Sequence, residues 1–267
     1  MTRTSVSLCG ILWCLLGVSC SGSDKATKPV SYADTARHNY EKGLRELKDD
    51  SFPESIKYFS FVKNKFPFSR YATLAELRIA DAQFGQDKFL EAIDAYKLFV
   101  KFHPTHPEVT NGYASYRICA AYMEQIPSDW FLVPPSHEKD QGATRDAMRA
   151  LTAFLKTFKR SKYLPKVKKL YRKCIRRLAD HELYVAQFYL ERDKPKATIL
   201  RLEALLNKYP DAGVDPQVML LLGQTYLKLE EHDKARKTFA DLIKKHPDDA
   251  HSKKARLYLQ YMSGQRD

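Results

Sequence analysis

The chain has 267 residues, enough for one large domain or two ordinary ones, and it carries 45 Lys and Arg against 32 Asp and Glu, a formal charge of +13. Its 12% aromatic content is too high for a disordered chain, and its 10 glycines lack the close groupings that bind phosphates in Rossmann or P-loop domains. The charge leaves three classes of partner open: nucleic acid, acidic lipid and acidic protein.

The first twenty residues have the pattern of an export signal rather than of a membrane-spanning helix. Arg3 is their only charge, and residues 6–18 are mostly apolar but fewer than the roughly 20 that a spanning helix needs. The string Leu15-Leu16-Gly17-Val18-Ser19-Cys20 resembles a bacterial lipobox, in which the cysteine thiol is acylated. We therefore predict a lipoprotein signal peptide over 1–19, with ordinary secretion and an uncleaved anchor as the alternatives.

Cys20 would then become the lipidated N-terminus of the mature chain. Several acyl chains at one residue exceed the roughly two signals that stable membrane anchoring requires. Residues 20–31 are polar and lack any periodicity, which is typical of a flexible tether. Apart from this covalent lipid, we expect no cofactor.

The other cysteines are too few for a disulfide scaffold. Cys9 and Cys14 leave with the signal peptide, so that only Cys119 and Cys174 remain beside Cys20. Both lie on apolar helical faces, which favours buried free thiols. A single disulfide in an oxidising compartment is the alternative.

From Tyr32 onward, apolar residues recur at helical spacing without a convincing alternating segment, which predicts an all-α fold. Four segments end in an aromatic residue or His followed by Pro, and the prolines at 67 and 104, like those at 210 and 247, are 37 residues apart. This spacing is close to the roughly 34 residues of a tetratricopeptide repeat (TPR). We predict a TPR solenoid of about five helical pairs, with a C-terminal capping helix at about 253–262.

Small and aromatic residues recur in a fixed frame ahead of these prolines. The string Leu222-Gly223-Gln224-Thr225-Tyr226 is followed by Ala235, Phe239 and Pro247, in the order of the TPR pattern. We expect the small residues where the two helices of a repeat cross closely. The equivalent positions elsewhere are Gly43, Ser55 and Phe59, then Ala80, Ala92 and Tyr96, then Ala186, Thr198 and Leu202.

The third helical pair, predicted over 109–126 and 143–158, is interrupted by an insert at 127–141. The insert contains Trp130, and a long aromatic loop either packs on its own repeat or anchors a partner or bilayer. We favour packing. The insert divides the solenoid into N-terminal repeats at 32–140 and C-terminal repeats with the capping helix at 141–267.

Three strings go beyond what a generic TPR protein requires. They are Phe66-Pro67-Phe68-Ser69, His103-Pro104-Thr105-His106-Pro107 and Glu182-Leu183-Tyr184-Val185-Ala186-Gln187-Phe188-Tyr189. With the lipobox and the interrupted third repeat, they make residues 32–250 resemble the BamD family of outer-membrane assembly lipoproteins, also called YfiO or ComL. The insert is where the chain departs most from this family.

The resemblance implies a lipid-anchored scaffold on the periplasmic face of the outer membrane. It also implies docking on the periplasmic POTRA domains of a BamA-like Omp85 barrel protein, contact with other assembly lipoproteins, and delivery of unfolded outer-membrane protein clients. The repeats alone leave open a generic TPR lipoprotein that coordinates cell division or envelope-polysaccharide assembly.

The sequence motifs do not support an enzyme or a metal site. Prolines break the helix that would place His103 and His106 on one face, and His181 with Glu182 lacks the second His of a zincin. No Gly-x-Ser-x-Gly elbow is present. We therefore predict no catalytic activity and no bound metal.

The excess positive charge is concentrated in one block. Loss of the signal peptide removes only Arg3, which leaves +12, and residues 147–179 hold twelve Lys or Arg and no acid. Apolar residues over 167–178 form a stripe at helical spacing, so that the cations occupy the other face. Five like-charge pairs at i, i+4 cost the isolated helix about 1 to 2.5 kcal/mol, which an anionic neighbour would offset. The twelve cations are Arg149, Lys156, Lys159, Arg160, Lys162, Lys166, Lys168, Lys169, Arg172, Lys173, Arg176 and Arg177.

A solvated face, an acidic protein or lipid head groups would each explain this block, with the protein ahead of the lipid. Nucleic acid is disfavoured because export removes the chain from the cytoplasm and the aromatic residues do not form an exposed stacking platform. If the partner is the barrel protein, we expect Lys169, Lys173 and Arg177 to contact it.

The resemblance adds Arg201, whose Arg-hydrophobic-Glu string aligns with one in the region of BamD that faces BamA. We expect it to form an ion pair with the partner. In the N-terminal repeats, Asn39, Arg78 and Gln83 fall on first helices, which line the concave face of a solenoid. They are our candidates for contact with an extended client peptide, against the alternative of ordinary solvated polar residues.

Overall fold

The computed structural model describes residues 36–127, 135 and 138–264, and within them it contains twelve α-helices and no β-strand. The predicted signal peptide, Cys20, the tether and Trp130 lie outside these residues. The helices are α1 (Ala36–Lys48), α2 (Phe52–Lys65), α3 (Arg70–Gly85), α4 (Phe89–Phe102), α5 (Pro107–Thr110), α6 (Tyr113–Glu124), α7 (Gly142–Thr157), α8 (Leu164–Glu191), α9 (Pro195–Lys208), α10 (Asp215–Lys228), α11 (His232–Lys245) and α12 (Ala250–Gly264).

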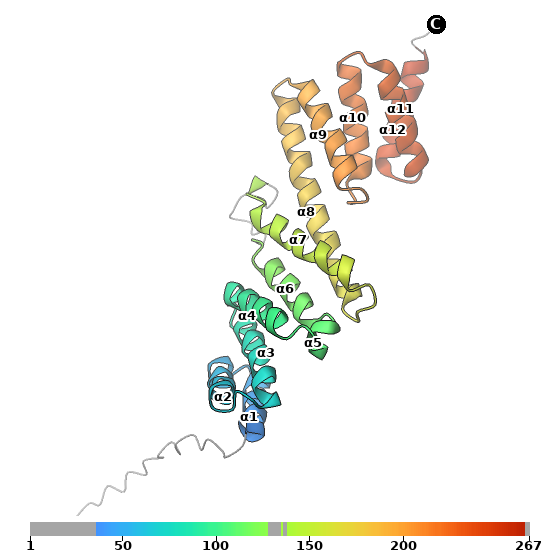
Figure 1. Cartoon of the computed structure of the whole chain (residues 1–267). Coiled ribbons are helices and arrows are strands. Elements are labelled where there is room, and N and C mark those ends of the chain that lie inside the picture. The colour runs from blue at the N-terminus through green and yellow to red at the C-terminus, as the bar shows by residue number, and fades with distance from the viewer. Residues whose placement is uncertain (1–35, 128–134, 136–137, 265–267) are drawn as a thin grey trace, which may run out of the picture. The chain divides into compact units, whose positions relative to one another are not determined.

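The helices pack as a chain of antiparallel pairs (Figure 1). The pairs are α1 with α2, α3 with α4, α6 with α7, α8 with α9, and α10 with α11, and each pair also contacts the next along the chain. The last helix, α12, packs on α10 and α11 and extends beyond the predicted 253–262 at both ends. The all-α fold with five pairs and a capping helix is confirmed.

The aromatic-Pro and His-Pro signals mark helix ends, as predicted. Phe66, His103, Tyr209 and His246 are the C-caps of α2, α4, α9 and α11, and each N–H bonds the carbonyl four residues earlier. The proline that follows each cap has no N–H and cannot extend the helix. Phe158 caps α7 in the same way but precedes Lys159, which is why this repeat lacked the signal.

The repeated small and aromatic positions form the crossing points of the pairs. An added Cβ at Gly223 would lie 2.3 Å from the ring of Phe239, and one at Gly43 would lie 2.7 Å from the ring of Phe59. The third pair follows the same frame with Ala147 and Leu151. The other predicted positions are also fully buried: Ser55, Ala80, Ala92, Tyr96, Ala186, Thr198, Leu202 and Ala235.

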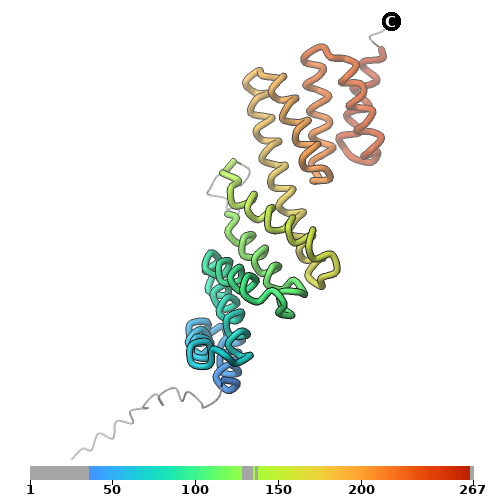
Figure 2. The backbone as a smooth tube through the Cα atoms, in the orientation of Figure 1, coloured from blue at the N-terminus to red at the C-terminus, as the bar shows by residue number. Residues whose placement is uncertain are grey.

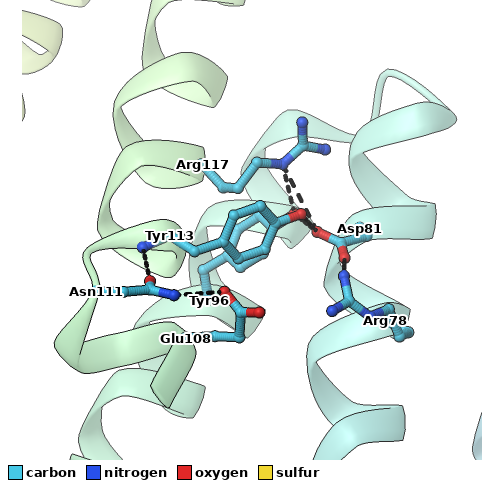
Figure 3. Close-up of polar contacts among 7 residues, drawn as sticks. All are labelled: Arg78, Asp81, Tyr96, Glu108, Asn111, Tyr113 and Arg117. Atoms are coloured by element: carbon cyan, nitrogen blue, oxygen red, sulfur yellow. Dashed lines mark hydrogen bonds and ion pairs between the residues drawn. The ribbon is translucent and has the colours of Figure 1, made fainter. Parts of the chain in front are cut away.

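The predicted helix at 109–126 is wrong in one respect, because the chain breaks at Asn111 and Gly112 into α5 and α6. Gly112 has φ of 87°, a left-handed conformation that glycine adopts without steric cost. The side chain of Asn111 accepts a hydrogen bond from Tyr113 N at 2.8 Å and donates one to Glu108 at 3.0 Å, as Figure 3 shows. These contacts end one helix and begin the next.

The longest helix, α8, has 28 residues and packs against α7 and α9; Figure 2 shows its long course through the backbone. It joins two hydrophobic cores. Val167 and Cys174 in its first half pack with residues of α6 and α7. Leu183 and Ala186 in its second half pack in the core that continues to α12. Although α8 exceeds the length of a bilayer-spanning helix, none of the described helices is apolar enough to cross a membrane.

Candidate protein-binding site

One face of α8 is buried and the opposite face is basic, as the sequence predicted. Val167, Cys174 and Leu178 are buried, while Leu170, Tyr171 and Ile175 are half-buried. Lys168, Lys169, Arg172 and Lys173 are exposed on the other side. The helix therefore separates an apolar stripe from a strip of cations.

The structure brings Lys169, Lys173 and Arg177 together at one hollow of about 720 Å³, which we call the basic groove. Arg172 and Arg176 line it as well, and its other walls come from the end of α6 and from the loop between α9 and α10. Met123, Ile126 and Cys174 supply apolar surface. Two acids, Asp180 and Asp211, also line the groove. Its lining therefore combines five cations with apolar side chains.

Two cations of the block have acidic partners just outside it. Arg149 pairs with Asp146, and Arg176 Nε lies 3.0 Å from Asp180 Oδ1. Arg176 also donates a hydrogen bond to the carbonyl of Gly213 at 2.8 Å. Counting charges inside 147–179 missed these pairs because both acids lie just outside the block. Asp146 is three residues before Arg149 and Asp180 is four residues after Arg176, the spacings at which helical side chains meet, so the sequence could have revealed both pairs.

Arg177 is held differently from its neighbours. One terminal nitrogen donates to the carbonyl of Pro127 at 2.8 Å, and its buried Nε has no hydrogen-bond partner among the described residues. A buried cationic donor without a partner carries a desolvation cost that an anionic ligand would relieve. Arg177 therefore differs from Lys169 and Lys173, whose exposed ammonium groups water can solvate.

Arg201 lies outside the basic groove, on α9. Its Nη1 is 3.3 Å from Glu182 Oε2 on α8, and the Arg201 side chain remains 47% exposed. The neighbouring Leu200 is 68% exposed. Arg201 therefore has an intramolecular partner that the sequence did not predict, together with an accessible apolar neighbour.

A buried polar cluster joins the second and third repeats around Asp81, which is 7% exposed (Figure 3). Its Oδ1 accepts hydrogen bonds from the hydroxyls of Tyr96 at 2.5 Å and Tyr113 at 2.7 Å. Its Oδ2 accepts one from Arg78, and Arg117 Nε donates to the Tyr96 hydroxyl at 3.0 Å. Helices α3, α4 and α6 thus meet at one carboxylate.

The environment of this cluster keeps both tyrosines protonated. Burial, and next the charge of Asp81, raise the pKa of Tyr96 and of Tyr113 above that of an ordinary tyrosine. The guanidinium of Arg117 lies 3.8 Å from the centre of the Phe84 ring, which adds a cation–π contact. The hydrogen bonds of this cluster therefore stabilise the packing of α3, α4 and α6.

The three predicted client-binding residues do not form an open groove. Asn39 is fully buried, so its predicted contact with a client is corrected: its side chain has no exposed surface that a ligand could touch. Arg78 is committed to Asp81, with its side chain 21% exposed. Gln83 is half-buried, and its Oε1 is a buried atom without a hydrogen-bond partner among the described residues.

The two histidines that were weighed as a metal pair, His103 and His106, both have hydrogen-bond partners within the chain. His103 Nε2 lies 2.9 Å from Glu76 Oε2, and His106 Nδ1 accepts a hydrogen bond from Glu108 N at the start of α5. In the part of the chain that the structure describes, no group of three or more His, Cys, Asp or Glu is placed to hold a metal ion.

Cys119 and Cys174 are free and buried, as the favoured alternative predicted. Burial, with a smaller effect from Cys174, raises the pKa of Cys119 to about 12. Burial raises the pKa of Cys174 to about 11. Both side chains therefore remain protonated thiols at neutral pH, packed in the core between α6, α7 and α8.

Comparison with known proteins places these features in a family. Residues 32–238 match the model of the YfiO family, described as an outer membrane lipoprotein. The chain is 23% identical over 247 residues to the outer membrane protein assembly factor BamD of Caulobacter vibrioides, covering 92% of this chain and 78% of the relative. It is 24% identical over 205 residues to BamD of Neisseria gonorrhoeae, covering 74% of each chain.

Among solved structures, the chain is similar to the TPR2AB domain of yeast Sti1 in its pHSP90 complex, at 12% identity and a TM-score of 0.47, with 86% of each chain covered. The family match runs from ahead of α1 into α11. The chain therefore belongs to the YfiO, or BamD, family of outer membrane lipoproteins.

Proposed function

We propose that the chain is a non-catalytic scaffold in the machinery that folds and inserts β-barrel proteins into the outer membrane. The observation that carries this proposal is the family match over residues 32–238, together with relatives named as outer membrane protein assembly factors. The shared name of these relatives favours this role over that of a generic TPR coordinator of cell division or envelope-polysaccharide assembly.

In this role Cys20 carries the lipid that holds the chain on the periplasmic face of the outer membrane. The lipobox-like string at the end of the signal peptide supports Cys20 as the lipidated residue. Replacing Cys20 with Ala removes the acylated thiol, so palmitate labelling and tight membrane retention should both be lost. Continued labelling of Cys20→Ala would contradict the anchor.

The proposed main partner is a BamA-like Omp85 barrel protein, bound through its POTRA domains. Arg201 and its exposed neighbour Leu200 support one contact, and Lys169, Lys173 and Arg177 support a second at the basic groove. Other assembly lipoproteins would join the same complex. Unfolded outer-membrane proteins are the proposed clients, with Arg78 and Gln83 as the remaining candidate contacts in the N-terminal repeats.

Affinity capture tests the partner directly. The full chain is isolated from outer membranes in mild detergent, and the captured proteins are identified by mass spectrometry. We expect an Omp85-type barrel to dominate. A capture that contains division or polysaccharide-assembly proteins and no Omp85 barrel would overturn the proposal.

The contribution of Arg201 can be separated from its internal ion pair. Arg201→Glu should reduce capture of the barrel partner, because it reverses an exposed charge at the proposed contact. Glu182→Gln is the matched control, since it breaks the Arg201–Glu182 pair and leaves the arginine in place. Equal losses in the two variants would show that Arg201 acts only through the packing of α8 and α9.

A further inference from the structure

The basic groove is one of three hollows that follow each other along the basic block. A hollow of about 630 Å³ lies at the loop between α7 and α8, and another of about 520 Å³ lies beside the first turns of α8. Lys159 lines both of these, and Arg172 lines both the second hollow and the basic groove. The shared residues place the three hollows next to one another along the block, and we call their combined lining the basic track.

Positive charge lines the basic track from end to end. Ten of the twelve cations of the block belong to it, all except Arg149 and Lys166. No acid lines the first two hollows among the described residues, and Asp180 and Asp211 line only the basic groove at the far end. The potential along the basic track is therefore strongly positive.

The cations in the middle of the track are available to a ligand. Lys168, Lys169, Arg172 and Lys173 are exposed, and none of them forms an ion pair with another residue in the described ranges. They sit within two helical turns of each other, where like charges repel. A ligand that carries several negative charges would remove this repulsion.

Apolar side chains lie between these cations. Leu155, Leu164 and Tyr171 line the middle hollow, and Met123 and Ile126 line the basic groove. A ligand that fits the whole track must therefore present apolar groups as well as negative charges. Hollows below the level of the surface suit side chains that insert one by one, whereas a flat membrane would meet the exposed cations only.

We propose that the basic track binds an extended polypeptide segment that presents acidic and apolar side chains together on one face. The stretch of α8 from Leu164 to Arg177 rises about 20 Å, at about 1.5 Å per residue. An extended peptide covers this distance with about six residues, at about 3.3 Å each. The segment can belong to the partner proposed above for Lys169, Lys173 and Arg177. The inference itself uses only the charge and shape of the track, so it does not depend on which protein carries the segment.

A synthetic peptide tests this inference on the full mature chain in detergent. The probe is a fluorescein-labelled ten-residue peptide in which pairs of Glu alternate with pairs of Leu, so that each face of the extended chain carries both residue types. Its binding is followed by fluorescence anisotropy at about 150 mM salt. We expect saturable binding that weakens at least tenfold when Gln replaces every Glu. We expect a similar loss for the double variant Lys169→Glu and Lys173→Glu.

The matched control is the double variant Lys237→Glu and Lys244→Glu, which makes the same charge change on exposed positions of α11. It should bind the acidic peptide like the parent chain. Equal weakening in the two double variants, or equal binding of the Glu and Gln probes, would overturn the proposal.

Binding to lipid vesicles tests the alternative that the basic track contacts acidic lipid head groups. The mature chain with Cys20→Ser, which has no lipid, is mixed with vesicles of phosphatidylcholine containing about 30% phosphatidylglycerol. We expect no retention that depends on Lys169 and Lys173. Retention that these substitutions abolish, in the absence of peptide binding, would assign the track to lipid head groups instead.

Discussion

Asp81 links the second and third repeats through buried polar contacts. Its carboxylate receives hydrogen bonds from Arg78, Tyr96 and Tyr113, and Arg117 lies 3.6 Å from it. A buried carboxylate is tolerated because these donors replace water. Removing it leaves two guanidinium groups and two hydroxyls without their common acceptor.

We predict that Asp81→Ala lowers the free energy of unfolding by about 3 kcal/mol, the lower end of the cost of breaking a buried pair, since Arg78 and Arg117 are partly exposed. Urea unfolding followed by circular dichroism measures the change. Asp94→Ala, at an exposed position of α4, is the control and should change stability by less than about 0.5 kcal/mol. Similar losses in the two variants would contradict the role assigned to Asp81.

The buried thiols predict a loss of stability at alkaline pH. The pKa values of about 12 for Cys119 and about 11 for Cys174 lie above the ordinary 9.0, so the unfolded chain releases these protons first as the pH rises. Their contribution is complete below pH 9 and declines above it, by up to about 1.4 kcal/mol per pH unit for each thiol. Urea unfolding at pH 8, 9 and 10 should show a shallower decline in Cys174→Ala than in the parent chain. Parallel declines would argue against the buried thiol as the cause.

The crossing of α10 with α11 shows how a helical pair depends on a small residue. Gly223 is helical, where glycine is normally unfavourable by up to about 1 kcal/mol relative to alanine. Here the ring of Phe239 occupies the space that a Cβ would need. Close packing of the pair therefore outweighs helix propensity at this position.

We predict that Gly223→Ala destabilises the chain by about 1 to 3 kcal/mol, the usual cost of overpacking a core. Thermal unfolding measures this loss. Gly264→Ala in α12 is the control because, apart from its chain neighbours and the adjacent helix backbone, nothing lies within 4 Å of its added Cβ, and it should leave stability within about 0.5 kcal/mol. A stabilised Gly223→Ala would mean that Phe239 moves aside freely.

At the scale of the whole molecule, local signals predicted the repeat architecture well. The prolines after Phe66, His103, Tyr209 and His246 act on the helix that they end, and so they can be read from the sequence. The third repeat was harder to delimit, because Lys159 stands where the other repeats have proline and Gly112 breaks the expected helix.

The candidate site was predicted only in part, because it depends on contacts between residues that are distant in sequence. The basic face of α8 follows from helical periodicity, so Lys169 and Lys173 could be placed on one side. The groove beside them needs Met123 and the loop at Gly213, which are distant in sequence. The Asp81 cluster likewise joins three helices, and Asn39 was taken for a surface residue because its burial depends on tertiary packing.

Depletion of the chain in cells tests its role in outer-membrane assembly most directly. The chromosomal copy is placed under a repressible promoter, and folded β-barrel proteins are quantified by heat-modifiable migration in outer-membrane fractions as the chain disappears. The proposed scaffold predicts that folded barrels fall in step with the chain, while unrelated outer-membrane lipoproteins keep their levels. Barrel proteins that remain fully folded and at normal abundance after the chain is gone would contradict it.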